Sequence, residues 1–494
     1  MTKFFFALTL FLFTLFGFAQ NTVKVIDAST KQSISYANIS VNNSEFLISN
    51  EEGYFTVSEA NSGDDAVVIV SYIGYAPQQL TMGQLKNKNL VVTLDPAVYE
   101  LNEVNTSKVK PDPNAIMQEV KKNLATNYKS NGKATKNTVF LRKTDAFKPS
   151  TVDVEIDKST GFNKTALKET NAEIQSFTSN LVKNPPLAFT DMLCNYYSGP
   201  KTKLDVVKAT VLQDEKRSAS LDGMEDKAAK LFLKHIDTTK YYRFKSGWFG
   251  TRDTISFRKD FNKKKAKKEP SKLENSKTSL ANFMKQQNFL EGSKMEFVTN
   301  PEIYEYSYDG AMYATNNEFL YVLKFKPRKS RANYTGKLYI SETDYAVVRA
   351  DYELAKGKTL EGLNVKLLLG IKFSQNVSKG TVIYKQNRDG NGYYLQYATN
   401  QTGTYLYVHR PLKFIELAKE DKDVVAFDLK AEGNMVNKTE FLTISHDEVS
   451  AADVEKVEEK EFAYVTLKKY DPSIWKNYSA IEPLEEMKQF EVAE

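Results

Sequence analysis

The sequence predicts a mainly β protein of the α+β type, with a small N-terminal β-sandwich followed by a larger domain with a curved antiparallel meander sheet and a few packed helices. Three observations support this. The 494 residues include 28 Tyr and 30 Phe, which favour strands. Residues 21–96 contain seven short strand-like segments separated by turns. From about residue 302 to 420, apolar and polar residues alternate with a period of two, as in half-buried strands.

Composition limits the class of function. Lys and Arg exceed Asp and Glu by 68 − 62 = +6, a weak positive charge for this size, so we expect no nucleic-acid partner. One cysteine and three histidines exclude an intramolecular disulfide framework and give no basis for a metal site. We therefore expect neither metal nor cofactor.

The first 19 residues have the pattern of a secretory signal peptide. Lys3 supplies a positive charge before the mostly apolar run Phe4–Phe18. Gly17 and Ala19 fit signal peptidase, so we place cleavage after Ala19. The alternative is a membrane anchor, which would need about 20 apolar residues, and this run has about 15. We expect an exported protein, periplasmic or associated with the outer membrane, with no transmembrane helix after cleavage.

Residues 21–96 are predicted to form the sandwich. Val23 and Val25 alternate with polar neighbours, and Gly53 lies where a turn requires a positive φ. Phe55 and Tyr72 are expected to fill the inner face. The predicted strands are Thr22–Ile26, Tyr36–Val41, Phe46–Ser49, Tyr54–Val57, Val67–Tyr72, Gln78–Thr81 and Leu90–Leu94.

Four segments in this region resemble the carboxypeptidase-type regulatory-like domain that is fused to the N-termini of outer-membrane receptors and other envelope proteins of Bacteroidetes. They are Tyr36–Val41, Ser49–Phe55, Val70–Tyr75 and Leu101–Val104. The resemblance implies a transthyretin-like β-sandwich over about residues 21–104 and a place in the cell envelope. The remainder of the chain resembles an uncharacterised envelope family. Within the sandwich, we interpret Asn50–Glu52 as a solvated turn; the alternative is a ligand or cation site.

The resemblance does not imply peptidase activity. In carboxypeptidases a separate zinc domain is catalytic and needs a His-x-x-Glu pair, which none of the three histidines begins. Nucleophile-elbow, phosphate-binding and dinucleotide motifs are also missing from the sequence. We assign no catalytic, cofactor-binding or metal residue and predict a protein that is not an enzyme. A hydrolase with a carboxylate pair is an alternative.

Residues 97–135 are predicted to hold a linker and one helix. Asn102–Asn114 contains lysines and prolines typical of an extended tether. A helix over Ala115–Tyr128, capped by Asp112 or Asn114, presents one apolar stripe. The members of the stripe are Ile116, Val120, Leu124 and Tyr128.

Residues 136–494 are predicted to form one α+β domain with an acidic C-terminal tail. Met224–His235 and Leu280–Leu290 are expected to be helical. Arg258–Lys272 is rich in lysine and is interpreted as a solvated loop, the alternative being a patch for anionic lipid or polysaccharide. Asp389–Gly392 predicts a hairpin turn. Further predicted strands are Lys337–Ser341, Ala346–Leu354, Val365–Phe373, Thr381–Gln386, Tyr393–Thr399, Thr404–His409 and Phe462–Leu467.

One strand of this sheet carries a candidate ligand face, composed of Phe319, Tyr321, Leu323 and Phe325. The neighbouring segment Gly336–Leu354 resembles the strand pair of lipoprotein-carrier-like envelope domains, which form a half-barrel around a helix. The resemblance implies a concave face that could hold an apolar ligand. The alternative is that the four residues are ordinary core beneath Leu280–Leu290.

These observations favour an exported, non-catalytic envelope protein that works by binding or assembly, with the sandwich as an interaction module. Its expected partners are an envelope protein or an apolar or glycan ligand. The second hypothesis is a periplasmic carrier of an apolar ligand. An outer-membrane barrel, a receptor component and a hydrolase are weaker alternatives.

Overall fold

The computed structural model describes residues 21–97, 111–129, 132–160, 163–213, 239–246, 249–256, 271–314, 318–418, 423–478 and 480–491. The predicted signal peptide, the Leu101–Val104 motif, nearly all of the linker, the Met224–His235 helix and most of the Arg258–Lys272 segment lie outside these residues. The chain divides into two compact units, each of which is described by itself. The first combines residues 1–104 with 312–318 and 471–488, and the second holds most of the remainder.

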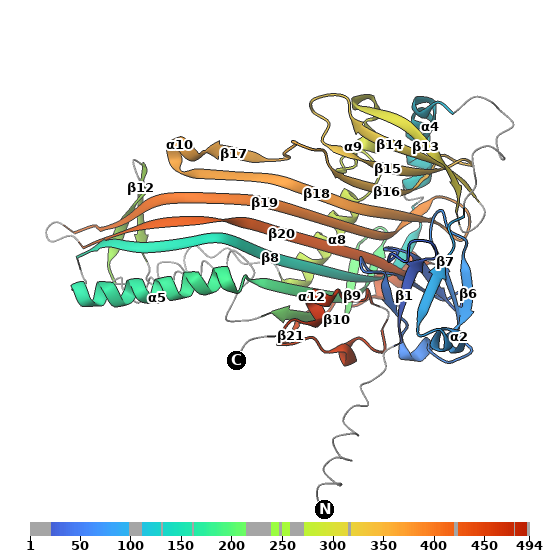
Figure 1. The fold of residues 1–494 in the computed structure, drawn as a ribbon, viewed down its shortest axis with the longest axis horizontal. Helices are drawn as coiled ribbons and strands as arrows, with labels where there is room; N and C mark the ends of the chain where they lie inside the picture. Colours follow the sequence, from blue (N-terminus) through green and yellow to red (C-terminus); the bar gives the residue numbers. More distant parts are fainter. Residues whose placement is uncertain are drawn as a thin grey trace, which may run out of the picture. The chain divides into compact units, whose positions relative to one another are not determined.

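The first unit contains the predicted β-sandwich, whose seven strands all form (Figure 1). One sheet has three strands in the order β4-β1-β7, and the other has four in the order β3-β2-β5-β6. The strands are β1 (Thr22–Asp27), β2 (Asn38–Val41), β3 (Glu45–Ile48), β4 (Tyr54–Thr56), β5 (Val67–Ser71), β6 (Gln78–Thr81) and β7 (Val91–Leu94).

Alternation along these strands places the apolar side chains between the two sheets. Val23 and Val25 are fully buried, and Phe55 is 1% exposed. Tyr72 is only partly buried and packs at the edge of this cluster, 5.6 Å from the ring of Tyr75. The expectation that Tyr72 fills the inner face was therefore wrong, because β5 ends at Ser71 and the ring follows the strand.

A short helix, α2 (Met82–Asn87), follows β6 and was not expected from the sequence. Thr81 and Gln84 form a capping box, in which each side chain bonds the backbone N–H of the other residue. Met82 and Leu85 are fully buried in the sandwich core. The capping pattern was present in the sequence.

The C-terminal segment completes the first unit. It contains η3 (Pro472–Ile474) and α12 (Glu485–Lys488). Asn50 is 1% exposed, and its Nδ2 donates to the backbone carbonyls of Glu482 (3.2 Å) and Pro483 (3.3 Å). Its Oδ1 accepts from the backbone N–H groups of Glu52 and Tyr54.

Carboxylates strengthen this attachment. Glu482 accepts from the hydroxyl of Thr56 at 2.5 Å and pairs with Lys488 at 2.7 Å. Glu52 accepts from the backbone N–H of Glu485. The interpretation of Asn50–Glu52 as a solvated turn was therefore wrong for Asn50, because its side chain is buried against another segment of the same chain. Glu51 is exposed and Glu52 is partly exposed.

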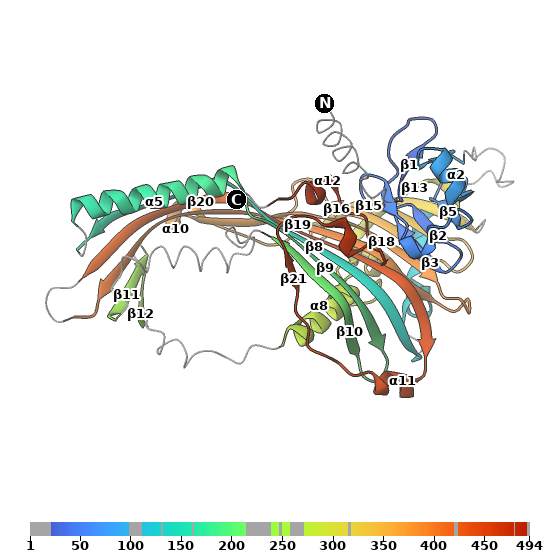
Figure 2. The ribbon, with the colours of Figure 1, turned by 90° about the horizontal axis from the view of Figure 1, so that it is seen from below.

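The second unit is dominated by one large curved sheet. The described residues place fourteen strands in it, with a main path β13-β14-β15-β16-β18-β19-β20-β8-β9-β10-β21. Figure 2 shows the sheet curving around α8. The main strands are β8 (Ala134–Ser159), β9 (Leu187–Ser198), β10 (Lys203–Gln213), β13 (Tyr304–Tyr313), β14 (Phe319–Pro327), β15 (Tyr334–Ser341), β16 (Val347–Leu354), β18 (Ile371–Gln386), β19 (Tyr393–Glu416), β20 (Val424–Val449) and β21 (Val465–Leu467).

The sheet is a meander only from β13 to β20. After β20 the next strand is β8, which is paired antiparallel with it from Ala134 opposite Val449 to Ser159 opposite Val425. The 26-residue strand β8 was not predicted from the sequence. The sheet therefore joins segments about 300 residues apart in sequence, a pairing that local periodicity does not reveal.

The long strands extend beyond the part of the sheet that α4 and α8 cover. We call this extension the β arm (Figures 1 and 2). The residues predicted as two strands, Tyr393–Thr399 and Thr404–His409, form the single strand β19. The predicted strand Val365–Phe373 is instead interrupted by a helical turn. Along the arm lie α5 (Lys164–Lys183), β11 (Tyr241–Ser246), β12 (Phe249–Ser256), β17 (Gly362–Val365) and α10 (Lys366–Leu369).

Helices fill the concave side of the sheet. In α4 (Pro113–Tyr128), capped by Asp112, the predicted stripe is buried, and it shares one core with residues of α8 (Lys272–Gln286). The helix predicted at Leu280–Leu290 begins earlier, at Lys272. Ser271 caps it, because its side-chain oxygen accepts a hydrogen bond from the backbone N–H of Glu274. The remaining helices are α9 (Glu296–Thr299), η2 (Pro301–Ile303) and α11 (Ala451–Lys456).

The tail after Ser445 is only partly as expected. β20 continues to Val449, α11 is short, and the predicted strand Phe462–Leu467 is reduced to β21. None of the described helices has the length and apolar character needed to cross a membrane.

Replacing Phe55 by Ala is expected to destabilise the sandwich by about 3–5 kcal/mol, because a fully buried ring leaves a cavity. Replacing the partly buried Tyr72 by Ala should cost clearly less. Both losses of stability are measured by urea unfolding of the full chain, in which hydrogen exchange of peptides from residues 21–96 reports on the sandwich. Equal losses for the two variants would contradict the burial described above.

Lys294 is a partly buried lysine on the concave side of the second unit. Its Nζ donates to Oδ1 of Asn400 at 2.5 Å and lies 5.0 Å from the ring centroid of Tyr352. Among the described residues no carboxylate pairs with it. Burial lowers the pKa of Lys294 from 10.5 to about 7.

This shift predicts a pH-dependent stability. Between pH 7 and 10.5 the unfolded chain binds the proton of Lys294 and the folded chain does not, so its contribution to the free energy of unfolding rises with pH in that window. Lys294→Met should therefore raise the melting temperature most at pH 6–7, with the gain shrinking towards pH 10. The exposed Lys326→Met is the control. A gain independent of pH would contradict the low pKa.

Candidate functional site

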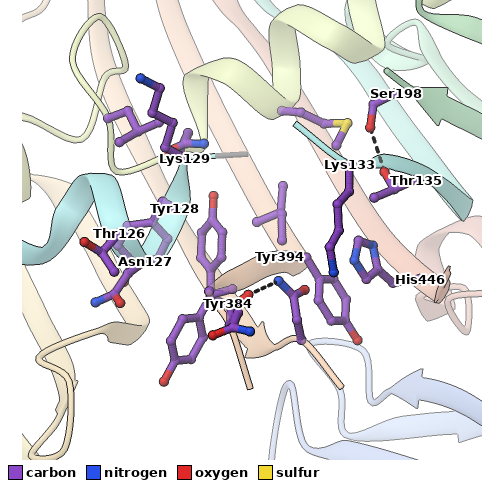
Figure 3. A pocket seen from close by; sticks show the side chains of 18 of the residues that line it. Thr126, Asn127, Tyr128, Lys129, Lys133, Thr135, Ser198, Tyr384, Tyr394 and His446 are labelled. Atoms are coloured by element: carbon purple, nitrogen blue, oxygen red, sulfur yellow. Dashed lines mark hydrogen bonds between the residues drawn. The ribbon is translucent and has the colours of Figure 1, made fainter. Parts of the chain in front are cut away.

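A pocket of about 640 Å³ lies in the second unit at one end of the sheet (Figure 3). It is formed where α4 ends, where β8 begins, after α8, at the β18–β19 hairpin and at the end of β20. The hairpin is the one predicted at Asp389–Gly392. Gly390 and Gly392 both have φ of 75°, a backbone conformation that favours glycine.

Aromatic rings form one wall of the pocket. The ring of Tyr128, from the last turn of α4, lies 5.0 Å from Tyr384 and 6.2 Å from Tyr393. The hydroxyl of Tyr128 donates to the carbonyl of Val347 at 2.9 Å. Burial raises the pKa of Tyr128 well above 10, so this phenol stays neutral. The three rings are 6–8% exposed and pack against one another, so they form a rigid aromatic wall suited to contact with the C–H groups of a ligand.

His446 lies on the opposite part of the lining, stacked on Tyr394 at 4.2 Å between ring centroids. Its Nδ1 lies 2.6 Å from Oδ1 of Asn137, and Nδ2 of Asn137 donates to the hydroxyl of Thr135. Burial lowers the pKa of His446, so the ring is neutral at pH 7. With Nδ1–H donating to Asn137, Nε2 is left as an acceptor.

Lys133, at the rim of the pocket, is already paired with two carboxylates. Nζ of Lys133 bonds Glu448 at 2.6 Å and Asp389 at 3.2 Å. These hydrogen bonds raise the pKa of Lys133. The pKa of Asp389 is lowered, first by the backbone N–H of Asn391 and then by Lys133. A single anionic ligand would have to compete with two carboxylates for this cation.

Two amide oxygens at the pocket have no donor. Oδ1 of Asn288 and Oδ1 of Asn387 are buried, and no group in the described residues bonds either. Nδ2 of Asn387 donates to the carbonyl of Asn391 at 2.6 Å, which fixes the orientation of that amide. Leaving a buried acceptor unsatisfied costs about 1–3 kcal/mol. A ligand with hydrogen-bond donors would recover this free energy.

The arrangement suits binding better than catalysis. Ser198 also lines the pocket, but its hydroxyl is 2.6 Å from that of Thr135, and within the described part of the chain no hydroxyl bonds His446. The described residues also include no group of three or more His, Cys, Asp or Glu that could hold a metal ion. Acceptor amides, tyrosine faces and balanced charges together fit a neutral, hydroxyl-rich ligand.

The residues predicted as a ligand face lie elsewhere. Leu323 is fully buried and Phe325 is 2% exposed, and the ring of Phe325 stacks on Phe297 at 4.5 Å. Phe319 and Tyr321 are partly buried and pack against each other at 5.6 Å. None of the four lines the pocket.

Few local patterns in the sequence indicated the pocket. The sequence predicted the hairpin and the apolar stripe of α4 that ends at Tyr128. It drew attention to His446 only because this histidine does not begin a His-x-x-Glu zinc motif. Asn137 and Ser198 lie in the stretch whose strands were missed. Their proximity depends on the pairing of β8 with β9 and β20, in which Asn137 is opposite both Tyr196 and His446.

Comparison with protein families identifies one region. The family model of the CarboxypepD_reg-like domain matches residues 24–106, in agreement with the seven-stranded sandwich. Searches of curated proteins and of solved structures gave no significant match.

Proposed function

We propose that this is an exported, non-catalytic protein of the cell envelope that binds a hydroxyl-rich ligand, of the glycan class, in the pocket of its second unit. Support for the envelope comes from the CarboxypepD_reg-like domain at residues 24–106, which typically occurs in envelope proteins, and from the signal-peptide pattern of residues 1–19. The sandwich would act as an interaction module beside the binding unit.

The observation that carries the ligand class is the pair of buried, unpaired amide oxygens of Asn288 and Asn387 beside the tyrosine wall. Sugars combine hydroxyl donors with C–H faces, so one ligand satisfies both features. The paired state of Lys133 argues against a simple anion.

The same structure weakens the carrier hypothesis. An apolar ligand would need an empty concave face, but α4, α8 and the loop after α8 fill it with buried side chains such as Leu280 and Phe289, both 0% exposed. The assembly hypothesis remains compatible with the proposal, because a glycan-binding unit and an interaction module can act together.

The ligand class is tested with neutral disaccharides, including an N-acetylhexosamine disaccharide, by isothermal titration calorimetry and NMR. Asn288→Leu removes the unpaired acceptor with little change in volume. We expect it to stabilise the free protein, by up to about 1–3 kcal/mol, and to weaken binding about tenfold. The exposed Asn184→Ala, at the end of α5, is the control.

Several results would count against the proposal. Absence of binding to every saccharide, or equal binding by Asn288→Leu, would reject the glycan class. Release of new reducing ends from a bound saccharide, lost in His446→Gln, would show that the site is catalytic.

Export makes a separate prediction. The mature protein should begin at Gln20, because Gly17 and Ala19 precede that bond as signal peptidase requires. N-terminal sequencing of protein from the envelope fraction checks this. Retention of Met1, or recovery from the cytoplasm, would refute export.

A further inference from the structure

The β arm carries an exposed apolar group at one edge. The edge strand β17 pairs with β18, and the helical turn α10 joins the two strands. Leu367 is 101% exposed, Leu368 is 85% exposed and Leu363 is 45% exposed. We call these three residues the leucine prong. No other large apolar side chains in the described residues are as exposed as Leu367 and Leu368.

The prong is held by specific contacts. Gly370 ends α10 with φ of 62°, and a Cβ there would lie 2.0 Å from the carbonyl oxygen of His409. The backbone N–H of His409 donates to the carbonyl of Gly370 at 2.7 Å.

Arg410 adds a second attachment. Its Nη1 donates to the carbonyl of Leu369 at 2.8 Å, and its Nε donates to the hydroxyl of Ser246 at 2.8 Å. The turn is thus tied to β19 and β11, and the leucines are presented on a fixed backbone.

The strands around the prong are uniformly basic. Gly362–Gln375, Thr404–Ile415 and Tyr241–Ser246 together contain six lysines and arginines and no acidic residue. Two of the lysines lie over tyrosine rings, Lys366 at 3.8 Å from Tyr407 and Lys372 at 5.4 Å from Tyr405.

Acidic groups on the adjacent strand β20 are already engaged. Asp428 lies 2.9 Å from Nε2 of His409, and Glu432 accepts from the hydroxyl of Tyr405. These contacts leave both carboxylates charged, but the six lysines and arginines outnumber them and the exposed Glu361 beside β17, so the surroundings of the leucines keep a net positive charge.

We propose that the leucine prong inserts into an anionic lipid surface, with the surrounding lysines and arginines contacting the headgroups. Exposed leucines lose unfavourable contact with water when they enter the acyl region, and cations beside them are attracted to anionic lipid. A protein groove fits this surface less well, because lysine is depleted at the centre of protein interfaces.

The test is vesicle co-sedimentation of the mature chain. Vesicles of phosphatidylethanolamine and phosphatidylglycerol (3:1) are compared with vesicles of phosphatidylcholine at low salt. The variants are Leu367→Ser/Leu368→Ser and Lys366→Glu/Lys372→Glu. Val207→Ser is the matched control, because Val207 is 45% exposed on β10, away from the arm.

Wild type and Val207→Ser should bind the anionic vesicles and bind the phosphatidylcholine vesicles at least tenfold more weakly. The leucine double variant should lose about a hundredfold of its partition coefficient, because each of its two buried leucines is worth about one factor of ten. The glutamate double variant should lose binding in a salt-dependent way.

Three results would overturn the proposal. These are no vesicle binding by wild type, binding unaffected by the leucine substitutions, and prong-dependent dimerisation in place of lipid binding. Thermal melts of the double variants check their folding, which exposed substitutions should leave intact. The outcome does not depend on the saccharide experiments.

Discussion

The packing of helices into the concave face of one large sheet is the interaction on which the second unit depends. A curved sheet with an apolar inner face must be covered, and α4 and α8 cover it with buried residues such as Val120 and Leu280. The aromatic group of Phe297, Phe325 and Tyr352 continues this core across the sheet. Because the interior is filled, the pocket forms where both helices end, at one end of the sheet.

The position of the pocket explains its polar character. At the ends of these strands, backbone and side-chain groups meet solvent, so amides, hydroxyls and paired charges are tolerated beside the tyrosines. His446 and Tyr394 are on neighbouring strands and Tyr128 is on a helix, yet all three reach the same space. The proposed binding and the fold are thus linked, since one set of helices closes the core and shapes the site.

Local patterns predicted the sandwich well and the second unit less well. The seven strands of the sandwich are short, consecutive and separated by turn residues, so period and turn chemistry were sufficient. In the second unit, β8 pairs with β20 across about 300 residues, and no local signal encodes such a partner. Strands of up to 26 residues also exceed usual lengths, which is why β19 was predicted as two strands.

The candidate ligand face shows a related limit. Alternation correctly places Leu323 and Phe325 on one side of β14, but it does not tell whether that side faces a cavity or a helix. The answer depended on α9, whose Phe297 covers Phe325, and such a short helix leaves almost no periodic signal. The pocket residues were missed for the opposite reason, because they are polar and come from many separate elements.

The attachment of residues 471–488 to the sandwich has a consequence for the order of folding during synthesis. The strands from β1 to β7 can pair as soon as they leave the ribosome. The amide of Asn50 can donate to the carbonyls of Glu482 and Pro483 only after more than 400 further residues have been synthesised. Contacts of such sequence separation form late. Until then the side-chain amide of Asn50 stays hydrated in the nascent chain, so this contact forms only after the last segment has been synthesised.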